Sequence, residues 1–548
     1  MPAKRLSILL SETETTEIRG SGDPLITSIR YDSRAVTEGS LFVAITGFHV
    51  DGHDYIGDAI ARGAAAVVLE RPETAGALAP DVPLVVVPRS RPALSSIAAI
   101  FHDHPSRDLL VIGVTGTDGK SSTVAFIEQI LTAAGFRAGL ISTVTVKTGD
   151  TLEKNPNRQS TPEAVELHGY LADMRAAGKE IAVVEATSHG LSPRTSRLAD
   201  VDFDLAVFTN LSHEHLEFHG SFEQYRDDKA NLFRALDRAP RGGERTGGRA
   251  EGAAVGAADA RRFAVINAGD EHGEYMAGAT RHPTLRYGIS GEPADSGLRA
   301  APSAVLNLTA RDVSPGIDGT RFTLADGAGN SRPLRLPMPG VFQVENVLAA
   351  LLAAAGATGR SPLELADAVE TLTPVEGRLV PVGRETPFAV VVDYAHTPNS
   401  YEKLFPIIRA STPGRIIALF GSAGERDIEK RALQGAVAAR HCELIVLCDE
   451  DPRGEEPAAI LRAIESGINA ADPDRRRGEG YLVIEDRRTA IRAAVDRAEP
   501  GDTIVLLGKG HERSIIYAEG PRPWNEAEVA LEVLIEAGYE QPRQEATT

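Results

Sequence analysis

The chain has 548 residues, of which 42% are hydrophobic and 25% charged, and its formal net charge is −19. This composition is that of a globular protein, and at roughly 150 residues per domain the length predicts three or four domains. The acidic balance without long basic runs excludes an evident nucleic-acid surface, and no apolar run approaches about 18 residues, so we expect no membrane insertion. The two cysteines, Cys442 and Cys448, form no disulfide or zinc-type pattern, which predicts a reducing compartment, the cytoplasm.

The first of three segments, residues 1–108, alternates short apolar strands with helical stretches and ends in a turn-rich linker at 102–107. This alternation predicts a small α/β domain. Its strands are expected at 41–44, 65–69 and 84–87, and its helices at 55–62 and 92–101.

The second segment, residues 109–375, begins with an apolar strand at 109–114, a glycine-rich loop and a helix at 120–134, which Gly135 would end. Continuous apolar runs of this kind are typical of parallel strands that are covered on both faces. Residues 239–262 are rich in Gly, Ala and Arg and are predicted to be a surface insertion without a catalytic role. Further strands are expected at 181–185, 205–209 and 263–266.

The third segment, residues 376–548, repeats the alternation of apolar strands and helical patterns most cleanly. It predicts a doubly wound sheet, so that the whole chain is an α/β protein of three domains. Its strands are expected at 388–392, 416–420, 444–447, 481–484 and 503–507.

The loop after the first strand of the second segment reads Gly113-Val-Thr-Gly-Thr-Asp-Gly-Lys-Ser-Ser. Gly116 and Gly119 allow backbone N–H groups to point at phosphate oxygens, and the following helix aims its positive end at the same place. Lys120 would neutralise the terminal phosphates of ATP, and the Ser121 hydroxyl would bind Mg²⁺. The first glycine is one residue earlier than in a strict Walker A motif, so a glycine-rich turn without ligand stays the alternative.

Candidate metal ligands follow the next strands. Glu185 ends a predicted strand, where open α/β sheets place their ligands, and a carboxylate suits a hard cation. His213, His215 and His219 follow another strand and predict a second Mg²⁺ site, with a polar surface loop as the alternative. Lys229 on its own is typical of a solvated helix lysine. The sequence offers no convincing Ser/His/Asp or Cys/His arrangement for nucleophilic catalysis.

Together these segments resemble the Mur ligase family of amide-forming synthetases over almost the whole chain. The N-terminal segment does so through Asp32-Ser-Arg, Gly39-Ser-Leu-Phe-Val-Ala and Asp51-Gly-His, and the phosphate loop matches with Asp118 where Asn is usual. The run Gly508-Lys-Gly-His-Glu is typical of the members that add the third residue of the peptidoglycan stem peptide. The resemblance implies a UDP-sugar-binding domain at 1–108, a central ATP-binding domain at 109–375 and a Rossmann-like, amino-acid-binding domain at 376–548.

The resemblance also implies the residues of each site. Catalytic groups are expected at Lys120, Glu185, His215 and Lys229, and Lys229 is expected to be carbamylated (N6-carboxylysine). The expected Mg²⁺ ligands are Ser121, Glu185, His215 and the Lys229 carbamate. ATP contacts are expected at Thr115, Gly116, Thr117, Asp118, Gly119, Lys120, Ser121, Ser122, Asn346, Arg378, Asp393 and His396. UDP-substrate contacts are expected at Ser33, Ser160, Thr161, Thr187, Ser188 and Arg197. Amino-acid contacts are expected at Arg426, Glu450, Asp451, Arg453, Gly508 and Glu512.

The implied reaction belongs to peptidoglycan precursor synthesis. ATP phosphorylates the terminal carboxylate of UDP-N-acetylmuramoyl-L-alanyl-D-glutamate, and the amine of an amino acid attacks the acyl phosphate. Two signals conflict about that amino acid. Arg453 suits the distal carboxylate of meso-diaminopimelate, whereas Glu450 and Asp451, where Asp and Asn are usual, favour the side-chain ammonium of lysine or ornithine. We favour lysine or ornithine; alternatively, Arg453 only pairs with nearby acids.

Two other functions remain open. Another ligase of the same fold, such as folylpolyglutamate synthase, would lack the Asp32-Ser-Arg segment and the Gly508-Lys-Gly-His-Glu run. A non-catalytic scaffold of the same fold would bind partners instead. The presence of four residues argues against it: Lys120, Glu185, His215 and Lys229. We expect small-molecule substrates only, and a monomer.

Overall fold

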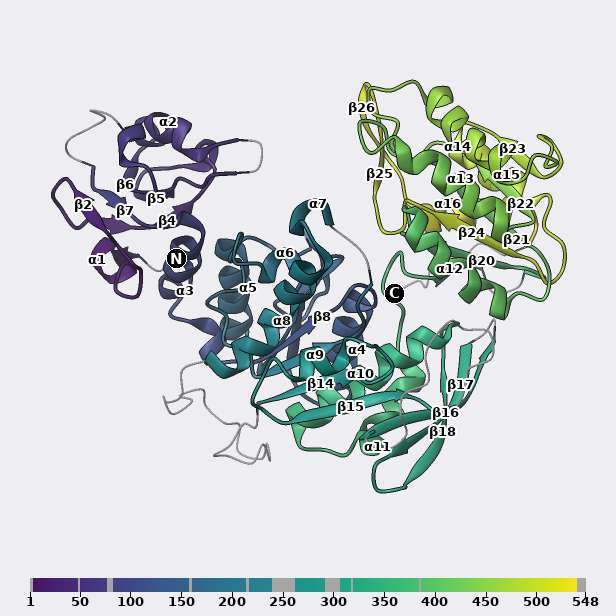
Figure 1. The fold of residues 1–548 in the computed structure, drawn as a ribbon, viewed down its shortest axis with the longest axis horizontal. Helices are drawn as coiled ribbons and strands as arrows, with labels where there is room; N and C mark the ends of the chain where they lie inside the picture. The colour runs from purple at the N-terminus through teal and green to yellow at the C-terminus, as the bar shows by residue number, and fades with distance from the viewer. Residues whose placement is uncertain are drawn as a thin grey trace, which may run out of the picture.

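The computed structural model describes residues 3–47, 50–75, 82–156, 160–212, 216–238, 262–290, 306–316, 319–383 and 386–539. Three main sheets, each from its own part of the chain, form three bodies: the purple N-terminal body and the green and yellow C-terminal body lie on either side of the blue and teal central body (Figure 1). The predicted α/β class is confirmed. The exact limits at residues 108 and 375 stay a proposal, which this division of the sheets supports.

The N-terminal sheet has five strands in the order β2-β7-β6-β5-β4. All neighbouring pairs are parallel except β2 with β7. Alternate side chains of its strands pack against α3 (Ser90–Phe101) on one face and α2 (Ile56–Ala61) on the other. Its strands are β2 (Glu17–Arg19), β4 (Ser28–Arg30), β5 (Ser40–Val43), β6 (Ala64–Leu69) and β7 (Leu84–Val86).

The central sheet has eleven strands in the order β11-β10-β9-β12-β8-β13-β14-β15-β16-β17-β18. The strands from β9 to β16 run parallel, and β8 lies in the middle with buried residues on both faces. α4 (Lys120–Ala133) and α10 (Val341–Thr358) cover one face, and α5 (Ala164–Ala176) and α8 (Phe222–Arg238) cover the other. The inner strands are β9 (Ala138–Ile141), β12 (Ile181–Glu185), β8 (Leu110–Thr115), β13 (Leu205–Phe208) and β14 (Phe263–Asn267).

The outer strands of the central sheet were not expected from the sequence. β16 and β17 pair antiparallel, as do β17 and β18, and many of their residues are partly or fully exposed. Half-exposed strands lack the continuous apolar run that indicates a buried parallel strand. Their bounds are β15 (Thr284–Ile289), β16 (Leu308–Gly316), β17 (Gly319–Asp326) and β18 (Ser331–Leu336).

Helix α10 is long and apolar enough, by length and composition alone, to cross a membrane, and the sequence analysis overlooked it. In the structure 83% of this window is buried inside the protein. Residues such as Val344, Leu348 and Leu351 pack against α4 and the central sheet. α10 is therefore the core helix of the central domain.

The C-terminal sheet has six strands in the order β19-β20-β24-β21-β22-β23, parallel except for β19. Helices α12 (Pro398–Ser411), α13 (Glu429–His441) and α14 (Pro457–Ala471) contribute to the core on one face, and α15 (Arg487–Val495) and α16 (Glu526–Glu536) to the core on the other. This two-sided cover confirms the predicted doubly wound sheet. Its parallel strands are β20 (Ala389–Asp393), β24 (Thr503–Leu507), β21 (Ile416–Phe420), β22 (Leu444–Leu447) and β23 (Tyr481–Val483).

Candidate active site

The glycine-rich loop joins the central strand β8 to the N-terminus of α4. Gly119 precedes the helix with φ 80°, and no side chain caps the first turn of α4. A Cβ on Gly119 would lie 2.3 Å from Asn346 Oδ1, so only glycine fits there. The first N–H groups of α4 have no partner within the helix, which makes this end suited to an anion. Lys120 Nζ lies at the same loop and donates to the carbonyls of Gly116 at 3.1 Å and Thr117 at 2.7 Å.

The end of β13 holds this loop in place. The Thr117 N–H donates to Asn210 O at 2.8 Å, and the Asp118 N–H donates to Asn210 Oδ1 at 2.9 Å. Thr209 Oγ1 donates in turn to Asp118 O at 2.7 Å. Because β13 neighbours β8 in the sheet, these bonds fix the loop's backbone before any ligand arrives.

Glu185 ends β12, the other neighbour of β8, and is 2% exposed. Its Oε2 accepts from Ser121 Oγ at 2.8 Å and from the Thr143 N–H at 2.8 Å. Thr143 Oγ1 donates to Oε1 at 2.8 Å. The structure thus brings Ser121 and Glu185 together at the start of α4, as hard oxygen donors that suit Mg²⁺. The sequence analysis missed Thr143, which follows β9 at the same edge of the sheet.

Lys229 lies on α8 and is 1% exposed, so it is not a solvated helix lysine. Its Nζ donates to Gly116 O at 2.5 Å and lies 4.5 Å from the centroid of the Tyr225 ring. The structure therefore brings Lys229 to the phosphate loop. His213 and His215 lie outside the described residues. No group of three or more His, Cys, Asp or Glu that could hold a metal ion is found within the described ranges.

A buried chain of hydrogen bonds joins Ser188, His219 and Asp228, which the sequence did not indicate. His219 Nδ1 is 2.7 Å from Asp228 Oδ2, and its Nε2 is 3.1 Å from Ser188 Oγ. Sequence spacing could not reveal it, because Ser188 comes from the start of α6 (Ser188–Leu191) and Asp228 from α8. All three residues are at most 6% exposed, so the chain fixes the orientation of Ser188 rather than presenting a nucleophile to solvent.

The other residues expected at the UDP-substrate are tied to this region through buried bonds. Thr161 Oγ1 donates to Glu185 O at 3.1 Å and is 2.8 Å from Thr187 Oγ1. Arg197 donates to Thr161 O at 3.0 Å and pairs with Glu163 at 2.8 Å. Thr161, Thr187 and Arg197 thus lie together beside Ser188. Ser160 directly precedes Thr161, and Ser33 lies in the N-terminal domain, on the turn η1 (Ser33–Ala35).

The C-terminal domain carries the residues expected on the other side of ATP. Asp393, at the end of β20, accepts the N–H groups of Leu379 at 2.9 Å and Ala395 at 2.8 Å. Burial raises the pKa of Asp393, an effect that the Arg378 guanidinium opposes. Burial also lowers the pKa of His396. Arg378 lies over the Tyr394 ring, 5.3 Å from its centroid.

Asn346, one of the expected ATP contacts, is bonded inside the protein next to the phosphate loop. Its Nδ2 donates to Gln343 Oε1 at 3.0 Å, and its Oδ1 accepts from Thr123 Oγ1 at 3.3 Å. It is 4% exposed and packs against Gly119. In this structure Asn346 supports the phosphate loop from α10.

The residues expected to bind the amino acid gather at the carboxyl ends of β22 and β24. Asp451 accepts from Lys509 Nζ at 2.7 Å and from the Ile516 N–H at 2.9 Å. Lys509 also pairs with Glu512 at 2.5 Å. Lys509 was missing from the predicted site, although it lies inside the Gly508–Glu512 run.

Glu450 and Arg453, in the same region, each keep a buried polar atom without a partner among the described residues. Glu450 is 6% exposed, and its Oε2 has no hydrogen-bond partner in the described part of the chain. A Cβ on Gly508, at φ 95°, would lie 2.5 Å from this oxygen, so the glycine keeps the space beside it. Burial raises the pKa of Glu450, while Lys430, Arg487 and Lys509 oppose the rise. Arg453 has φ 54°, and its buried Nε likewise lacks a partner among the described residues. Arg426 is exposed.

Three family models match the chain: the Mur ligase family catalytic domain over residues 25–102, the Mur ligase middle domain over 114–241 and the Mur ligase glutamate ligase domain over 377–510. The chain belongs to the Mur ligase family. Members of this family are ATP-dependent ligases, and the family assignment confirms the resemblance drawn from the motifs.

The relatives carry closely related names. The UDP-N-acetylmuramyl-tripeptide synthetase of Roseiflexus sp. (strain RS-1) is 47% identical over 94% of this chain and 96% of the relative. The protein of that name from Treponema pallidum (strain Nichols) is 42% identical over 97% of both. Among solved structures, a UDP-N-acetylmuramoyl-L-alanyl-D-glutamate–2,6-diaminopimelate ligase is 27% identical with a TM-score of 0.61, over 94% of this chain and 96% of that one.

Two further features of this Mur ligase were not anticipated. A half-buried carboxyl group, Glu345 on α10, lies near Asp270 and accepts from Asn267 Nδ2 at 3.5 Å. Asn267 Nδ2 also donates to Thr209 O, so the group stands behind the strand end that holds the phosphate loop. Burial raises the pKa of Glu345 to about 7.

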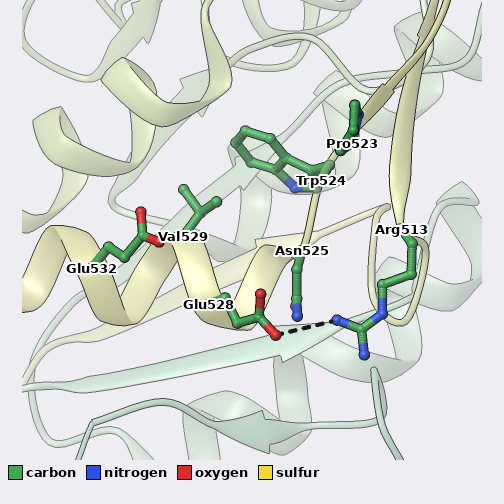
Figure 2. Close-up of a pocket in the computed structure, with 7 residues that line it drawn as sticks. All are labelled: Arg513, Pro523, Trp524, Asn525, Glu528, Val529 and Glu532. Carbon is green, nitrogen blue, oxygen red and sulfur yellow. Dashed lines mark ion pairs between the residues drawn. The ribbon is translucent and has the colours of Figure 1, made fainter. Parts of the chain in front are cut away.

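A shallow pocket of about 360 Å³ opens on the C-terminal domain next to the Gly508–Glu512 run (Figure 2). Figure 2 shows Arg513 pointing at Glu528, with 3.6 Å between them, and Trp524 above the start of α16. None of the predicted site residues lines it. This pocket is therefore separate from the candidate active site, whose residues lie on the loops at the sheet edges.

Proposed function

We propose that this chain is an ATP-dependent ligase that adds a diamino acid to UDP-N-acetylmuramoyl-L-alanyl-D-glutamate in peptidoglycan precursor synthesis. The observation that carries the proposal is the meeting of Lys120, Lys229 and the Ser121–Glu185 pair around the phosphate loop. These groups come from three different segments, and their convergence on one loop supports a phosphoryl-transfer site. The names of the relatives support the acceptor.

The residues act mainly by positioning and by electrostatics. The first N–H groups of α4 and the Lys120 ammonium would bind the phosphates of ATP, which offsets the repulsion between ATP and the acceptor carboxylate. The carboxylate attacks the terminal phosphate, ADP leaves, and the amine of the amino acid then displaces phosphate to form the amide. No protein nucleophile is needed, which agrees with the burial of Ser188 and His219.

The chemistry of the donors supports a Mg²⁺ site at Ser121 and Glu185. A bound Mg²⁺ would supply charge neutralisation between the two anionic substrates. A second ion would require the Lys229 carbamate and His215. The Lys229 amine is buried and adjacent to the loop, so carbamylation there would add an anionic oxygen ligand where the resemblance expects one.

The UDP-substrate would lie between the N-terminal and central domains. Ser188 and Thr187 lie at the start of α6, directly after β12 and its Glu185. Ser33 would reach the same substrate from the N-terminal domain. Arg197 is buried and bonded to Thr161 and Glu163, so its proposed role is to hold the segment around Thr161 in place.

For the amino acid we propose lysine or ornithine. Asp451 and Glu512 share the single Lys509 ammonium, which leaves this part of the pocket acidic. Glu450 Oε2 is without a partner in the described residues and would accept from a side-chain ammonium. Arg453 makes no ion pair with an acid in the described chain, which weighs against the alternative that it only pairs locally, and it would bind one carboxylate. Lysine and ornithine bring one carboxylate and two amines, whereas meso-diaminopimelate brings a second carboxylate to an already acidic pocket.

One assay tests both the reaction and the amino acid. The purified chain is incubated with ATP, Mg²⁺ and UDP-N-acetylmuramoyl-L-alanyl-D-glutamate, together with lysine, ornithine or meso-diaminopimelate in parallel. We expect phosphate release and a UDP-tripeptide mass with lysine or ornithine. Release with diaminopimelate alone would overturn the proposed amino acid. No release with any of the three would overturn the ligase and favour a scaffold, and turnover of a folate with glutamate would favour the folylpolyglutamate alternative.

We further propose that the enzyme acts as a monomer in the cytoplasm. Cys442 and Cys448 are both buried free thiols, which suits a reducing compartment. Burial raises the pKa of both thiols, so they stay protonated and unreactive at neutral pH.

A further inference from the structure

Lys403, on the C-terminal helix α12, reaches into the central domain. Its Nζ lies 2.7 Å from Asp118 Oδ2, although the two residues are 285 positions apart. It also donates to Ser212 Oγ. Figure 1 draws α12 on the side of the C-terminal domain that faces the central domain. One ammonium therefore joins the C-terminal domain to two loops of the central domain.

Both loops belong to the candidate ATP site. Asp118 lies within the phosphate loop, between Thr117 and Gly119, with its N–H fixed by Asn210. Ser212 follows β13, and its N–H donates to Thr117 Oγ1 at 2.9 Å. Thr117 Oγ1 donates back to Ser212 O at 3.2 Å. Lys403 thus contacts two segments that are already bonded to each other and that surround the proposed phosphate site.

The negative charge of Asp118 suggests what the contact with Lys403 does. A carboxylate on a phosphate loop repels the polyphosphate that the loop is built to bind. Lys120 is not paired with this carboxylate, because its Nζ donates to the carbonyls of Gly116 and Thr117. Within the described ranges, the cation paired with Asp118 is Lys403. Neutralisation of the loop thus comes from another domain.

We propose that Lys403 is a positioning residue that couples the seating of the C-terminal domain to nucleotide binding. With the domain seated, Lys403 cancels the Asp118 charge and holds the phosphate loop against the Ser212 loop. When the domain moves away from the loop, Asp118 loses its pairing with Lys403. Its negative charge then lowers the affinity for nucleotide, which favours release of ADP. The inference rests on the proposed function, because it requires ATP at this loop.

The test measures the affinity of four variants for a non-hydrolysable ATP analogue by calorimetry, together with KM for ATP. Lys403→Met should weaken binding by about two- to fivefold, the range for a partly exposed pair, with a smaller effect on kcat. Asp118→Asn, which removes the repulsive charge, should bind at least as tightly as the wild type. The double variant should bind like Asp118→Asn, because Lys403 has no charge left to cancel. Lys403→Arg should retain near-normal binding.

A matched control removes a positive charge from the same helix without touching the loop. Arg409 on α12 pairs with Glu443 at 2.7 Å inside the C-terminal domain, so Arg409→Met should leave nucleotide binding unchanged. The Lys403→Met defect should also shrink as ionic strength rises, because both partners are partly exposed.

Three results would overturn the inference. The first is a loss of nucleotide affinity in Lys403→Met that is no larger than the loss in Arg409→Met. The second is a double variant that binds as weakly as Lys403→Met, which would mean that Lys403 acts on the nucleotide itself. The third is a loss of affinity in Lys403→Met that does not change with salt concentration. A wild-type chain that binds no ATP analogue would overturn the proposed function as well. Binding by the wild type with an unchanged Lys403→Met affinity would overturn only this inference.

Discussion

The phosphate loop of this Mur ligase and the pocket that we propose for the amino acid use their side chains in opposite ways. Around the loop the side chains are already bonded within the protein: Asn346 to Gln343, and Asp118 to Lys403. What stays available is backbone, the first turn of α4. In the pocket, by contrast, Glu450 and Arg453 keep buried polar atoms without partners in the described part of the chain.

The difference matches what each region has to recognise. A phosphate is the same in every turnover, so a fixed backbone cradle suffices and its side chains are free to brace it. An amino acid must be selected from similar molecules, and a buried group left without a partner penalises any ligand that fails to satisfy it. Changes at the loop should therefore stop turnover with every amino acid, whereas changes in the pocket should alter which amino acid is used.

The largest effect is expected for Lys229→Ala. The variant loses the proposed anionic carbamate beside the loop, so kcat should fall on the order of 10³-fold with every amino acid. Added short-chain carboxylates should restore part of the activity by standing in for the carbamate. Steady-state phosphate release measures both.

Lys179→Ala is the control for Lys229→Ala. Lys179 is also a buried lysine of the central domain, but it pairs with Asp150 and does not contact the loop. It should retain near-normal turnover. Full activity of Lys229→Ala would refute the carbamate.

Gly119→Ala should give the next largest effect. The added Cβ would lie 2.3 Å from Asn346 Oδ1 at φ 80°, so either the loop or the Asn346 side chain that supports it must shift, and a shift of this kind costs about ten- to a hundredfold in kcat/KM for ATP. Gly135→Ala provides the matched comparison, because Gly135 has φ 89° but nothing within 4 Å of the added Cβ. It should lower stability without changing KM for ATP. Equal kinetic losses in the two variants would show that backbone strain, not the cradle, is responsible.

Arg453→Met should alter the amino-acid pocket alone. Loss of one charge-assisted pair to a carboxylate should raise KM for the amino acid about tenfold, while KM for ATP stays unchanged. Glu450→Gln should raise KM for lysine or ornithine more than KM for diaminopimelate, which is measured in parallel assays. A matching rise in KM for ATP in either variant would contradict the separation of the two regions.

The same contrast explains what the sequence could predict. The phosphate loop is contiguous, so its strand, glycines and helix start were visible together, and the buried strands β12, β21, β22 and β24 were located to the residue. Groups that depend on distant segments were not visible. Thr143 beside Glu185, Lys403 beside Asp118, and His219 between Ser188 and Asp228 each join segments that only the folded sheet brings together.

The partly exposed strands were the other part of the structure that the sequence did not predict. β16, β17 and β18 alternate buried and exposed residues too irregularly for a clear period of two, partly because of a bulge between Arg311 and Ser314. The roles of the individual site residues stay predictions, and His215 lies outside the described residues.

The smallest expected effect is on the pH dependence of stability, which the Glu345 carboxyl group influences. Burial raises its pKa from 4.5 to about 7 in the folded state. Between these values the folded chain binds more protons than the unfolded chain, so stability falls as pH rises through the window from about 4.5 to 7. The full cost, on the order of 3 kcal/mol, is present above that window. Glu345→Gln should therefore melt several degrees above the wild type at pH 8 and at the same temperature near pH 4.5.

Measuring Glu450→Gln in the same experiment compares a carboxyl group of the pocket with Glu345, which lies behind the phosphate loop. Burial raises the pKa of Glu450 too, so its variant should show a gain of the same sign, but Lys430, Arg487 and Lys509 oppose that rise. The pH-dependent gain should therefore be smaller for Glu450→Gln than for Glu345→Gln. Calorimetry between pH 4.5 and 8, which resolves the transitions of separate domains, measures both. A larger pH-dependent rise in melting temperature for Glu450→Gln would mean that the nearby cations do not compensate the Glu450 carboxylate. The pocket would then be more acidic than these contacts indicate, and that acidity is what we propose favours lysine or ornithine.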